Sequence, residues 1–235
     1  TAGFVTINYN TGDDNASGLD IPGEQRVSGI GGGAIQAGYS PLIDGTCQPI
    51  SDIDFVNYTT APQGSTYMDV NVASSRCYAF RLAVWDNASN RVTYKMQNET
   101  LKYVKADSTP PADISAVLDD GFYTFDRQQL RAWWNPTTDS GSGVAHYYWQ
   151  VYQDDTAKPD DCNISYVRIN SSVNVNCSLF KDGINSGNVT NPMVLITGLN
   201  LTHNYKYYFA VTPFDKAGNN GSTTFSDGII YVDNA

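Results

Sequence analysis

The fold of this chain is decided by the stretch Tyr205-Lys206-Tyr207-Tyr208-Phe209-Ala210-Val211, in which apolar residues recur at every second position. The same alternation runs through Tyr78-Ala79-Phe80-Arg81-Leu82-Ala83-Val84. A period of two is typical of a β-strand with one face on a hydrophobic core. Similar tails follow the two stretches, Asp86-Asn87-Ala88-Ser89-Asn90 and Asp215-Lys216-Ala217-Gly218-Asn219, and both are typical of a tight turn. We therefore predict two equivalent strands, with Tyr78 matched to Tyr205.

A second pair of landmarks shows that the chain repeats itself. Ser28-Gly29-Ile30 precedes Cys47, and Ser142-Gly143-Val144 precedes Cys162 at nearly the same spacing. Landmarks that recur in the same order indicate two copies of one structural unit.

The copies are joined by Asp107-Ser108-Thr109-Pro110-Pro111. Its two prolines block helix formation and sheet pairing, which is typical of a stiff, extended linker. A chain of 235 residues and 25.7 kDa is long enough for two ordinary domains. We predict one domain in residues 1–106 and another in residues 107–235.

The composition favours strands and argues against several classes of partner. Tyrosine is abundant at 16 residues while charged residues make up only 16%, a mix that suits half-buried strands joined by turns. A net charge of −10 argues against nucleic acid or an anionic membrane as a partner. No apolar run approaches the ~18 residues that span a bilayer, so we expect no membrane contact from this segment.

Signals for N-linked glycosylation are far more frequent than the composition would give by chance. The chain contains ten Asn-x-Ser/Thr sequons without a central proline. Sequons mark exposed surface of secreted proteins, so we predict an extracellular or cell-surface glycoprotein. The acceptors are Asn15, Asn57, Asn87, Asn98, Asn163, Asn170, Asn176, Asn188, Asn200 and Asn220.

The four cysteines are interpreted as disulfides. They lack the Cys-x-x-Cys spacing of a zinc site, and the only histidines are His146 and His203. In an oxidising compartment an even number of cysteines indicates disulfide bonds. We predict one within each half, Cys47–Cys77 and Cys162–Cys177.

Three motifs of the second half carry a family resemblance. They are Leu130-Arg131-Ala132-Trp133-Trp134-Asn135-Pro136, His146-Tyr147-Tyr148-Trp149-Gln150-Val151-Tyr152, and Gly198-Leu199 with Tyr205 six residues beyond the leucine. They resemble strand B, strand C and the tyrosine corner of fibronectin type III repeats. The resemblance implies an all-β chain of two tandem antiparallel β-sandwiches, fibronectin type III-like or immunoglobulin-like. It also implies that the Tyr205 hydroxyl returns to the backbone at the corner.

The first half resembles the family less closely. Strand B is expected at Leu19-Asp20-Ile21, but no tryptophan follows it. The expected strand C is weakened by Gly31-Gly32-Gly33. Val72 and Tyr78 keep the six-residue spacing of the corner. We expect a degenerate or shortened sandwich, completed in one interpretation by a neighbouring chain.

The sequence contains few candidates for catalytic or cofactor-binding motifs. Gly29-x-Gly31-x-x-Ala34 imitates a dinucleotide-binding fingerprint, but no helical pattern follows, so a glycine loop or strand bulge is expected. Neither histidine has a nucleophile nearby, and glutamate is scarce. We expect no enzyme activity and no cofactor.

Structural calcium is the one metal that the sequence leaves open. Asp107 in the linker, with Asp119 or Asp120 and with Asp215, would have to converge to supply the six to eight oxygen ligands that calcium takes. None has the spacing of a known calcium loop, and the alternative is that these aspartates cap turns and hairpins in solvent.

Four aromatic residues are candidates for an interface. Trp133 and Trp134 are adjacent, so only one of them can face its own core. Trp85 and Phe214 fall at matching positions, out of phase with or just beyond the inward residues. The outward tryptophan is either shielded by a glycan or a loop or packed on another subunit, and we favour the second. The stretch from Asn98 to Asn163 contains no other sequon and is the expected contact surface.

The linker and turn motifs also resemble those of large tandem-repeat surface glycoproteins, such as adhesins, hyalin-like matrix proteins and mastigoneme-type filaments. The terminal Tyr231-Val232-Asp233-Asn234-Ala235 is similar to Tyr103-Val104-Lys105-Ala106-Asp107, so we expect a mature chain or a piece of a longer head-to-tail array. This implies a structural protein whose partners are copies of itself or adjacent repeats. The alternative is a ligand-binding ectodomain segment of an adhesion receptor, with contacts through Thr156–Asp161 or Lys181–Thr190.

Overall fold

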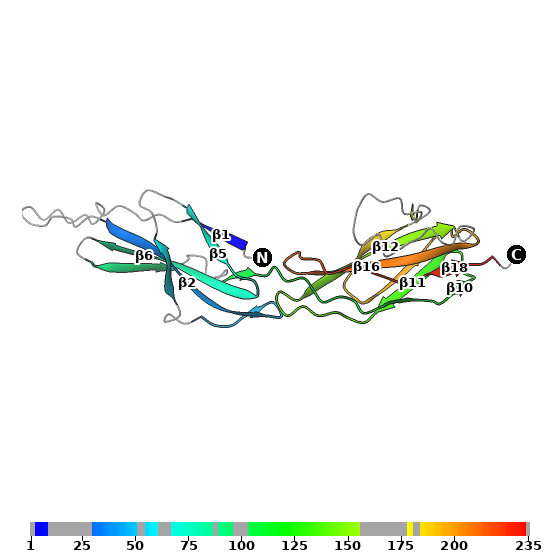
Figure 1. The fold of residues 1–235 in the computed structure, drawn as a ribbon, viewed down its shortest axis with the longest axis horizontal. Coiled ribbons are helices and arrows are strands. Elements are labelled where there is room, and N and C mark those ends of the chain that lie inside the picture. Colours follow the sequence, from blue (N-terminus) through cyan, green and yellow to red (C-terminus); the bar gives the residue numbers. More distant parts are fainter. Residues whose placement is uncertain are drawn as a thin grey trace, which may run out of the picture. The chain divides into compact units, whose positions relative to one another are not determined.

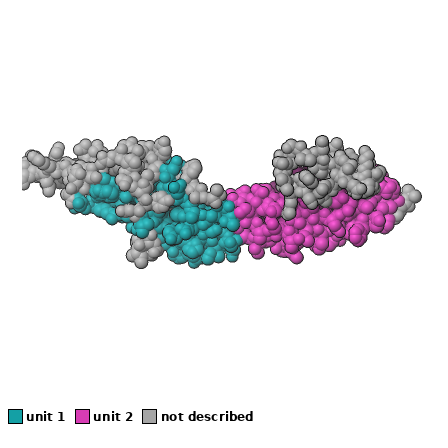
Figure 2. All heavy atoms as spheres, viewed as in Figure 1, with its two compact units in different colours: residues 1–109, 140–142 teal, residues 110–139, 143–235 magenta. Residues whose placement is uncertain are grey.

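The structure is a computed structural model that describes residues 3–8, 30–50, 55–60, 67–86, 89–95, 103–155, 178–180 and 184–233. These residues form strands, turns and loops, and no helix among them is long and apolar enough to cross a membrane. The chain divides into two compact units (Figures 1 and 2). Unit 1 comprises Thr1–Thr109 and Ser140–Ser142, and unit 2 comprises Pro110–Asp139 and Gly143–Ala235. The predicted all-β fold class is confirmed, and the described strand pairs are antiparallel except for β10 with β18, which is parallel.

Unit 2 is built from two sheets. The smaller has the order β15-β11-β9, with strands Met193–Thr197, Gln129–Trp134 and Val117–Asp119. The larger has the order β10-β18-β16-β12-β13, with β14 on β12 and β17 on β16. Its strands are β10 (Tyr123–Thr124), β12 (Val144–Asp155), β13 (Ser178–Leu179), β14 (Ser186–Val189), β16 (Tyr205–Asp215), β17 (Thr224–Phe225) and β18 (Ile229–Tyr231). A three-stranded sheet and a larger sheet with these strand orders are the arrangement of an immunoglobulin-like sandwich.

Unit 1 has the same plan with fewer described strands. One sheet pairs β1 (Gly3–Asn8) with β5 (Tyr67–Val72). The other has the order β3-β2-β6-β7, with β4 on β2 and β8 on β6. Its strands are β2 (Ile30–Ile43), β3 (Thr46–Cys47), β4 (Val56–Thr60), β6 (Arg76–Asp86), β7 (Arg91–Lys95) and β8 (Val104–Ala106).

The two units share the register of their central strand pair, β2 with β6 in unit 1 and β12 with β16 in unit 2. Strands β6 and β16 are both 11 residues long, and in both pairs a register shift follows the first partners. The end partners are Ile30–Asp86 and Pro41–Arg76 in unit 1, and Val144–Asp215 and Asp155–Tyr205 in unit 2. Ile30 and Val144 therefore occupy equivalent positions in the two strand pairs, as predicted.

A buried tyrosine anchors each of these strand pairs. The Tyr207 hydroxyl accepts a hydrogen bond from the Thr202 amide at 2.8 Å, and its ring is fully buried. In unit 1, the Tyr78 hydroxyl accepts the Ala73 amide at the same distance. Each contact returns a buried hydroxyl to the backbone five residues earlier, which is the tyrosine corner of the sandwich fold.

The predicted corner in unit 2 was wrong by two residues. Tyr205, which the sequence analysis placed there, lies at the edge of the core. The six-residue spacing from Leu199 to Tyr205 recurs from Leu201 to Tyr207, and both leucines are buried. Because alternation puts Tyr205 and Tyr207 on one face, the pattern alone could not separate them.

The register shift places a ring against its cross-strand partner in both units. In unit 1, Gly32 lies opposite Trp85, and a Cβ atom at Gly32 would come within 2.8 Å of the indole. In unit 2, His146 lies opposite Phe214, and the two rings stack with centroids 5.1 Å apart and planes 3° apart. The expected bulge among the glycines is therefore present, and Gly32 is required by the indole.

One expectation for unit 1 was not met, and a second concerns residues outside the described part of the chain. Strand β2 is continuous over 14 residues and includes Gly31–Gly33, so the glycines do not weaken it enough to interrupt it. Strand β1 pairs with β5 in the way that β11 pairs with β15, and it takes the place that was expected for strand B. Leu19–Ile21, the predicted strand B, lies outside the described residues.

The core of each unit collects the inward residues of both sheets. In unit 2 it includes Leu130, Trp134, Trp149, Val151, Tyr207, Phe209 and Val211. In unit 1 it includes Ile35, Ala37, Val70, Val72, Tyr78, Phe80 and Leu82. The alternating residues of the opening stretches are therefore core residues, except for Tyr205 and Val84, which are partly buried and pack against the two cores.

The position of the corner is tested by removing one hydroxyl. Tyr207→Phe leaves the Thr202 amide without its acceptor, so we expect unit 2 to lose about 1–3 kcal/mol of unfolding free energy. Tyr205→Phe is the matched control and should change stability by less than about 0.5 kcal/mol. Denaturant unfolding of the whole chain, followed by tryptophan fluorescence, measures both. A larger loss for Tyr205→Phe would restore the corner predicted from the sequence.

Candidate functional site

The outer surface of the three-stranded sheet in unit 2 carries an exposed apolar row. Trp133 of β11 lies directly between Leu118 of β9 and Met193 of β15. In the next row Arg131 lies opposite Leu195. Trp133 is 36% exposed, and Leu118, Met193 and Leu195 are each exposed by half or slightly more. We call these five residues the Trp133 face.

Charged groups border the Trp133 face. The Arg131 guanidinium carbon lies 5.1 Å from the centroid of the Trp133 ring, within the range of a cation–π contact. Arg131 also donates to Asp120 Oδ1 from Nε at 3.0 Å and from Nη2 at 2.5 Å. The face is therefore amphipathic, with an apolar middle and an ion pair at its side.

Trp134, the second candidate for an interface, is a core residue. Its exposed fraction is 3%, and its ring meets Tyr147 edge to face at 5.3 Å. Among the described residues its Nε1 is buried without a hydrogen-bond partner, so apolar packing alone holds the ring. Because adjacent strand residues face opposite ways, burying Trp134 turns Trp133 outward. Trp134 is thus removed from the candidate interface.

Trp85 and Phe214, the remaining candidates, are half-buried in their own units. Trp85 covers Gly32, and Phe214 stacks on His146. A role of either residue in a contact with another molecule stays a prediction.

Three of the ten predicted glycan acceptors are described with their side chains, and all three are exposed: Asn188, Asn200 and Asn220. Asn57 lies in β4, where only its backbone is described. Asn15, Asn87, Asn98, Asn163, Asn170 and Asn176 lie outside the described residues. Occupancy of all ten stays a prediction, and exposure is the condition that the three described acceptors meet.

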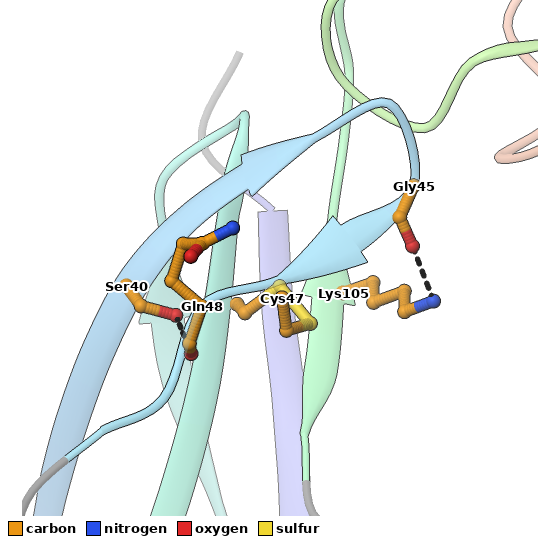
Figure 3. Close-up of a disulfide and its surroundings, with 6 residues drawn as sticks. Ser40, Gly45, Cys47, Gln48 and Lys105 are labelled. Atoms are coloured by element: carbon orange, nitrogen blue, oxygen red, sulfur yellow. Dashed lines mark hydrogen bonds between the residues drawn. A yellow bond between two sulfur atoms is a disulfide. The ribbon is translucent and has the colours of Figure 1, made fainter.

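One of the two predicted disulfides is present, and Figure 3 shows its surroundings. Cys47 of β3 bonds to Cys77 of β6, with Cα atoms 5.7 Å apart. Nearby, Lys105 of β8 donates to the Gly45 carbonyl at 2.6 Å, and Ser40 of β2 donates to the Gln48 carbonyl at 2.7 Å. Four strands of unit 1 are therefore tied together at one end. Cys162 and Cys177 lie outside the described residues, and their disulfide stays a prediction.

A two-residue turn beside the disulfide was missed in the sequence analysis. Asp44 and Gly45 join β2 to β3 with φ values of 46° and 74°. Positive φ at both positions is the type I′ turn that an Asp-Gly pair favours in hairpins. The Asp-Gly dipeptide between two apolar stretches was the signal that could have predicted this hairpin.

The same turn binds the segment Ser140–Ser142, which belongs to unit 1. The Asp44 amide donates to the Ser140 carbonyl at 3.3 Å, and the Gly45 amide donates to the Gly141 carbonyl at 2.8 Å. Asp107 accepts the Ser142 amide at 2.6 Å. Burial would raise the pKa of Asp107, but hydrogen bonds from Thr109, Ser142 and Ser74 outweigh it and lower the pKa.

Asp119 and Asp120, proposed from the sequence as calcium ligands, serve other contacts in unit 2. Asp119 accepts the amides of Gly121 and Gly228 at 3.1 and 3.2 Å, and burial raises its pKa despite these bonds. Asp120 pairs with Arg131. Asp119 caps a turn, as the alternative interpretation expects, but it is buried and not in solvent, and Asp120 forms an ion pair that neither interpretation predicted.

Asp215 holds the turn after β16. Its Oδ1 accepts the amides of Ala217 and Asn219 at 2.8 Å each, and its Oδ2 accepts the Asn219 side-chain amide at 2.7 Å. Gly218 between them has a φ of 92°. This explains the predicted turn: the Asp-x-Ala-Gly-Asn sequence supplies an accepting carboxylate, three N–H donor groups and the residue that tolerates positive φ. Ser89, with a φ of 69°, occupies the matching position in unit 1.

Asp139 is a buried carboxylate that the sequence analysis did not single out. It accepts the Gly143 amide at 2.6 Å, and one of its oxygens lies within 4.8 Å of a carboxylate oxygen of Asp215. This pair in unit 2 has four carboxylate oxygens, fewer than the six to eight oxygen ligands that calcium takes.

The two histidines have structural contacts. His146 stacks on Phe214, and His203 Nδ1 accepts the Asp233 amide at 2.9 Å. These contacts give each ring a role within unit 2.

Comparison of the sequence with protein-family models and with curated proteins found no match. Among solved structures, a fragment of titin aligns with 97% of this chain at 11% identity and a TM-score of 0.43, and the chain spans 58% of that fragment. A domain of a biofilm-associated protein aligns with 88% of the chain at 14% identity and a TM-score of 0.26, over 27% of its own length. A beta-1,2-glucanase from Parabacteroides distasonis aligns with 87% at 11% identity and a TM-score of 0.24, over 28% of its length. At such low identities and TM-scores these likenesses carry no functional assignment.

The contribution of the disulfide can be measured directly. Cys47→Ala/Cys77→Ala opens a loop with a sequence separation of 30, so we expect unit 1 to lose about 3–4 kcal/mol of unfolding free energy. The Tyr207→Phe variant, altered in unit 2, is the reference that keeps the disulfide. In denaturant unfolding of the whole chain, the transition of unit 1 should occur at a lower denaturant concentration in the cysteine variant than in wild type, and the transition of unit 2 should not shift. If the transition of unit 1 does not shift either, the strands hold this end of unit 1 without the covalent bond.

Proposed function

We propose that this chain is a structural, N-glycosylated extracellular repeat protein whose copies assemble head to tail into a surface fibre or matrix. The observation that carries the proposal is the shared register of the two central strand pairs, β2 with β6 and β12 with β16. Two units that keep one strand length, one register shift and one tyrosine corner are repeats of a single building block.

Repeats of this kind suit a mechanical role. Each unit closes its core between two sheets, and the tyrosine corner joins a strand of one sheet to the segment leading out of the other. In unit 1 the Cys47–Cys77 disulfide adds a covalent tie to strands that hydrogen bonds already hold. The tyrosine corner, the hydrogen bonds between strands and the disulfide each raise the free energy needed to separate the strands.

An extracellular location is supported by the disulfide and by the acceptor sites. Disulfides persist in oxidising compartments and are rare in the cytosol. Asn188, Asn200 and Asn220 are exposed acceptors on unit 2. A glycan coat on an acidic chain with a net charge of −10 would protect it from proteases and keep it in solution.

The partners in this proposal are copies of the chain or adjacent repeats, and the protein is not an enzyme. The acidic residues considered for metal binding are engaged in hydrogen bonds, turns and an ion pair: Asp107, Asp119, Asp120 and Asp215. The acidic surface argues against nucleic acid. No residue of this segment is assigned to membrane contact or to a cofactor.

Electron microscopy of the native, unproteolysed protein tests the proposal. We expect filaments or sheets with an axial repeat close to the length of two sandwich domains. Preparations at low and high protein concentration provide the control, because assembly should grow with concentration. Dispersed single particles at all concentrations would contradict the proposal and favour the adhesion-receptor alternative, for which ligand screening is the next experiment.

A further inference from the structure

The Trp133 face is an exposed apolar surface on a regular sheet of unit 2, and its size limits what can cover it. Its four apolar side chains expose on the order of 400 Å², which lies within the range of the largest patch on an ordinary monomer. A stable protein–protein interface buries ~800 Å² on each partner. The face is therefore about half as large as a stable contact between two copies requires.

One glycan acceptor, Asn200, lies on the same outer side as the Trp133 face, where the chain continues beyond β15. Leu199 and Leu201 are both buried, so Asn200 between them is on the outer side of the chain as it continues from β15. This continuation stays beside the strand leading into β11, because the amides of Leu199 and Leu201 donate to the carbonyls of Gln128 and Arg127. Asn200 is therefore at the end of the surface on which Leu195 and Met193 stand.

The other two described acceptors belong to the larger sheet. Asn188 is in β14, opposite Tyr148 of β12, and Asn220 bridges to Phe214 of β16. Of the acceptors described with their side chains, Asn200 is thus the one placed to reach the Trp133 face.

The sequon at Asn200 is also held rigidly. Its third residue is Thr202, and the Thr202 amide makes the hydrogen bond to the buried Tyr207 hydroxyl. The tyrosine corner and the sequon Asn200-Leu201-Thr202 are therefore one structural element. The backbone from which a glycan on Asn200 starts is therefore held in place.

We propose that the N-glycan of Asn200 folds back along the outer surface of the three-stranded sheet and covers the Trp133 face. The path begins at the polar row of Thr197 and Gln129, which lie opposite each other, and continues to Leu195 with Arg131. Successive rows are ~6.6 Å apart along a strand, so a chain of a few sugar residues spans them.

The chemistry of the face fits a saccharide. A pyranose ring has an apolar C–H side and a rim of hydroxyls, so it needs an aromatic or aliphatic surface flanked by hydrogen-bonding groups. Trp133, Met193 and Leu195 supply the first, and Arg131 with Asp120 supplies donors and acceptors at the side. The covering group is tethered, so its contacts gain from a high effective concentration and need not be strong individually.

The inference rests on the proposed function only in requiring glycosylation, and it is independent of filament assembly. It is tested by the rate at which hydrogen peroxide oxidises Met193, measured by peptide mass spectrometry on the folded, secreted chain from a glycosylating host. Met193 is half exposed in the protein part alone, and its thioether is converted to the sulfoxide when peroxide reaches it. The same peptide maps report whether Asn200 is occupied.

Two variants at Thr202 make a matched pair. Thr202→Ala destroys the sequon and Thr202→Ser keeps it, while both retain the backbone amide that Tyr207 accepts. We expect Met193 to oxidise several-fold faster in Thr202→Ala than in wild type, and at the wild-type rate in Thr202→Ser. Ser222→Ala, which removes the sequon of Asn220, should leave the rate unchanged. Trimming the glycans of folded wild-type protein with an endoglycosidase should reproduce the Thr202→Ala result without any effect on folding.

Three outcomes would overturn the proposal. Asn200 without glycan in the secreted protein is the first. Equal oxidation rates before and after trimming, with Asn200 occupied, is the second. Protection that survives in Thr202→Ala and grows with protein concentration is the third, and it would assign the Trp133 face to a second copy of the chain.

Discussion

Both units depend on the antiparallel pairing of two long strands in one register, β2 with β6 and β12 with β16. This pairing fixes which residues face the core, because a slip of one residue would turn every side chain to the opposite face. At one end a buried tyrosine, Tyr78 or Tyr207, ties the pair to the backbone of the corner. At the other end a register shift seats an aromatic ring against its neighbour, and a turn reverses the chain.

The units stabilise this shared frame in different ways. Unit 2 packs Trp134 and Trp149 into a core that draws on both sheets. Unit 1 has Ile35 at the register position of Trp149, and it adds the disulfide and the Asp44-Gly45 turn. A smaller side chain at the centre of the core weakens apolar packing, and a disulfide that closes a loop compensates by restricting the unfolded chain.

The sequence predicted the features that depend on local pattern, and it failed where a tertiary contact decides. Alternation identified the strands around Tyr78 and Tyr207, and the repeated landmarks matched Ile30 to Val144 as the register does. The same alternation could not tell Tyr205 from Tyr207, because a shift of two residues preserves it. The glycines of β2 were expected to weaken the strand, but the Trp85 indole that needs Gly32 beneath it is brought there only by folding.

We hold that the chain is a pair of mechanically resistant repeats, with the Cys47–Cys77 disulfide crosslinking unit 1. Single-molecule force spectroscopy on the intact chain, pulled from its two ends, tests this most directly. We predict two separate unfolding events, and replacing Cys47 and Cys77 by alanine should lengthen one of them by about 100 Å, because it releases a sequence separation of 30 residues. Smooth extension at low force without distinct events, in wild type and in the cysteine variant, would contradict the account.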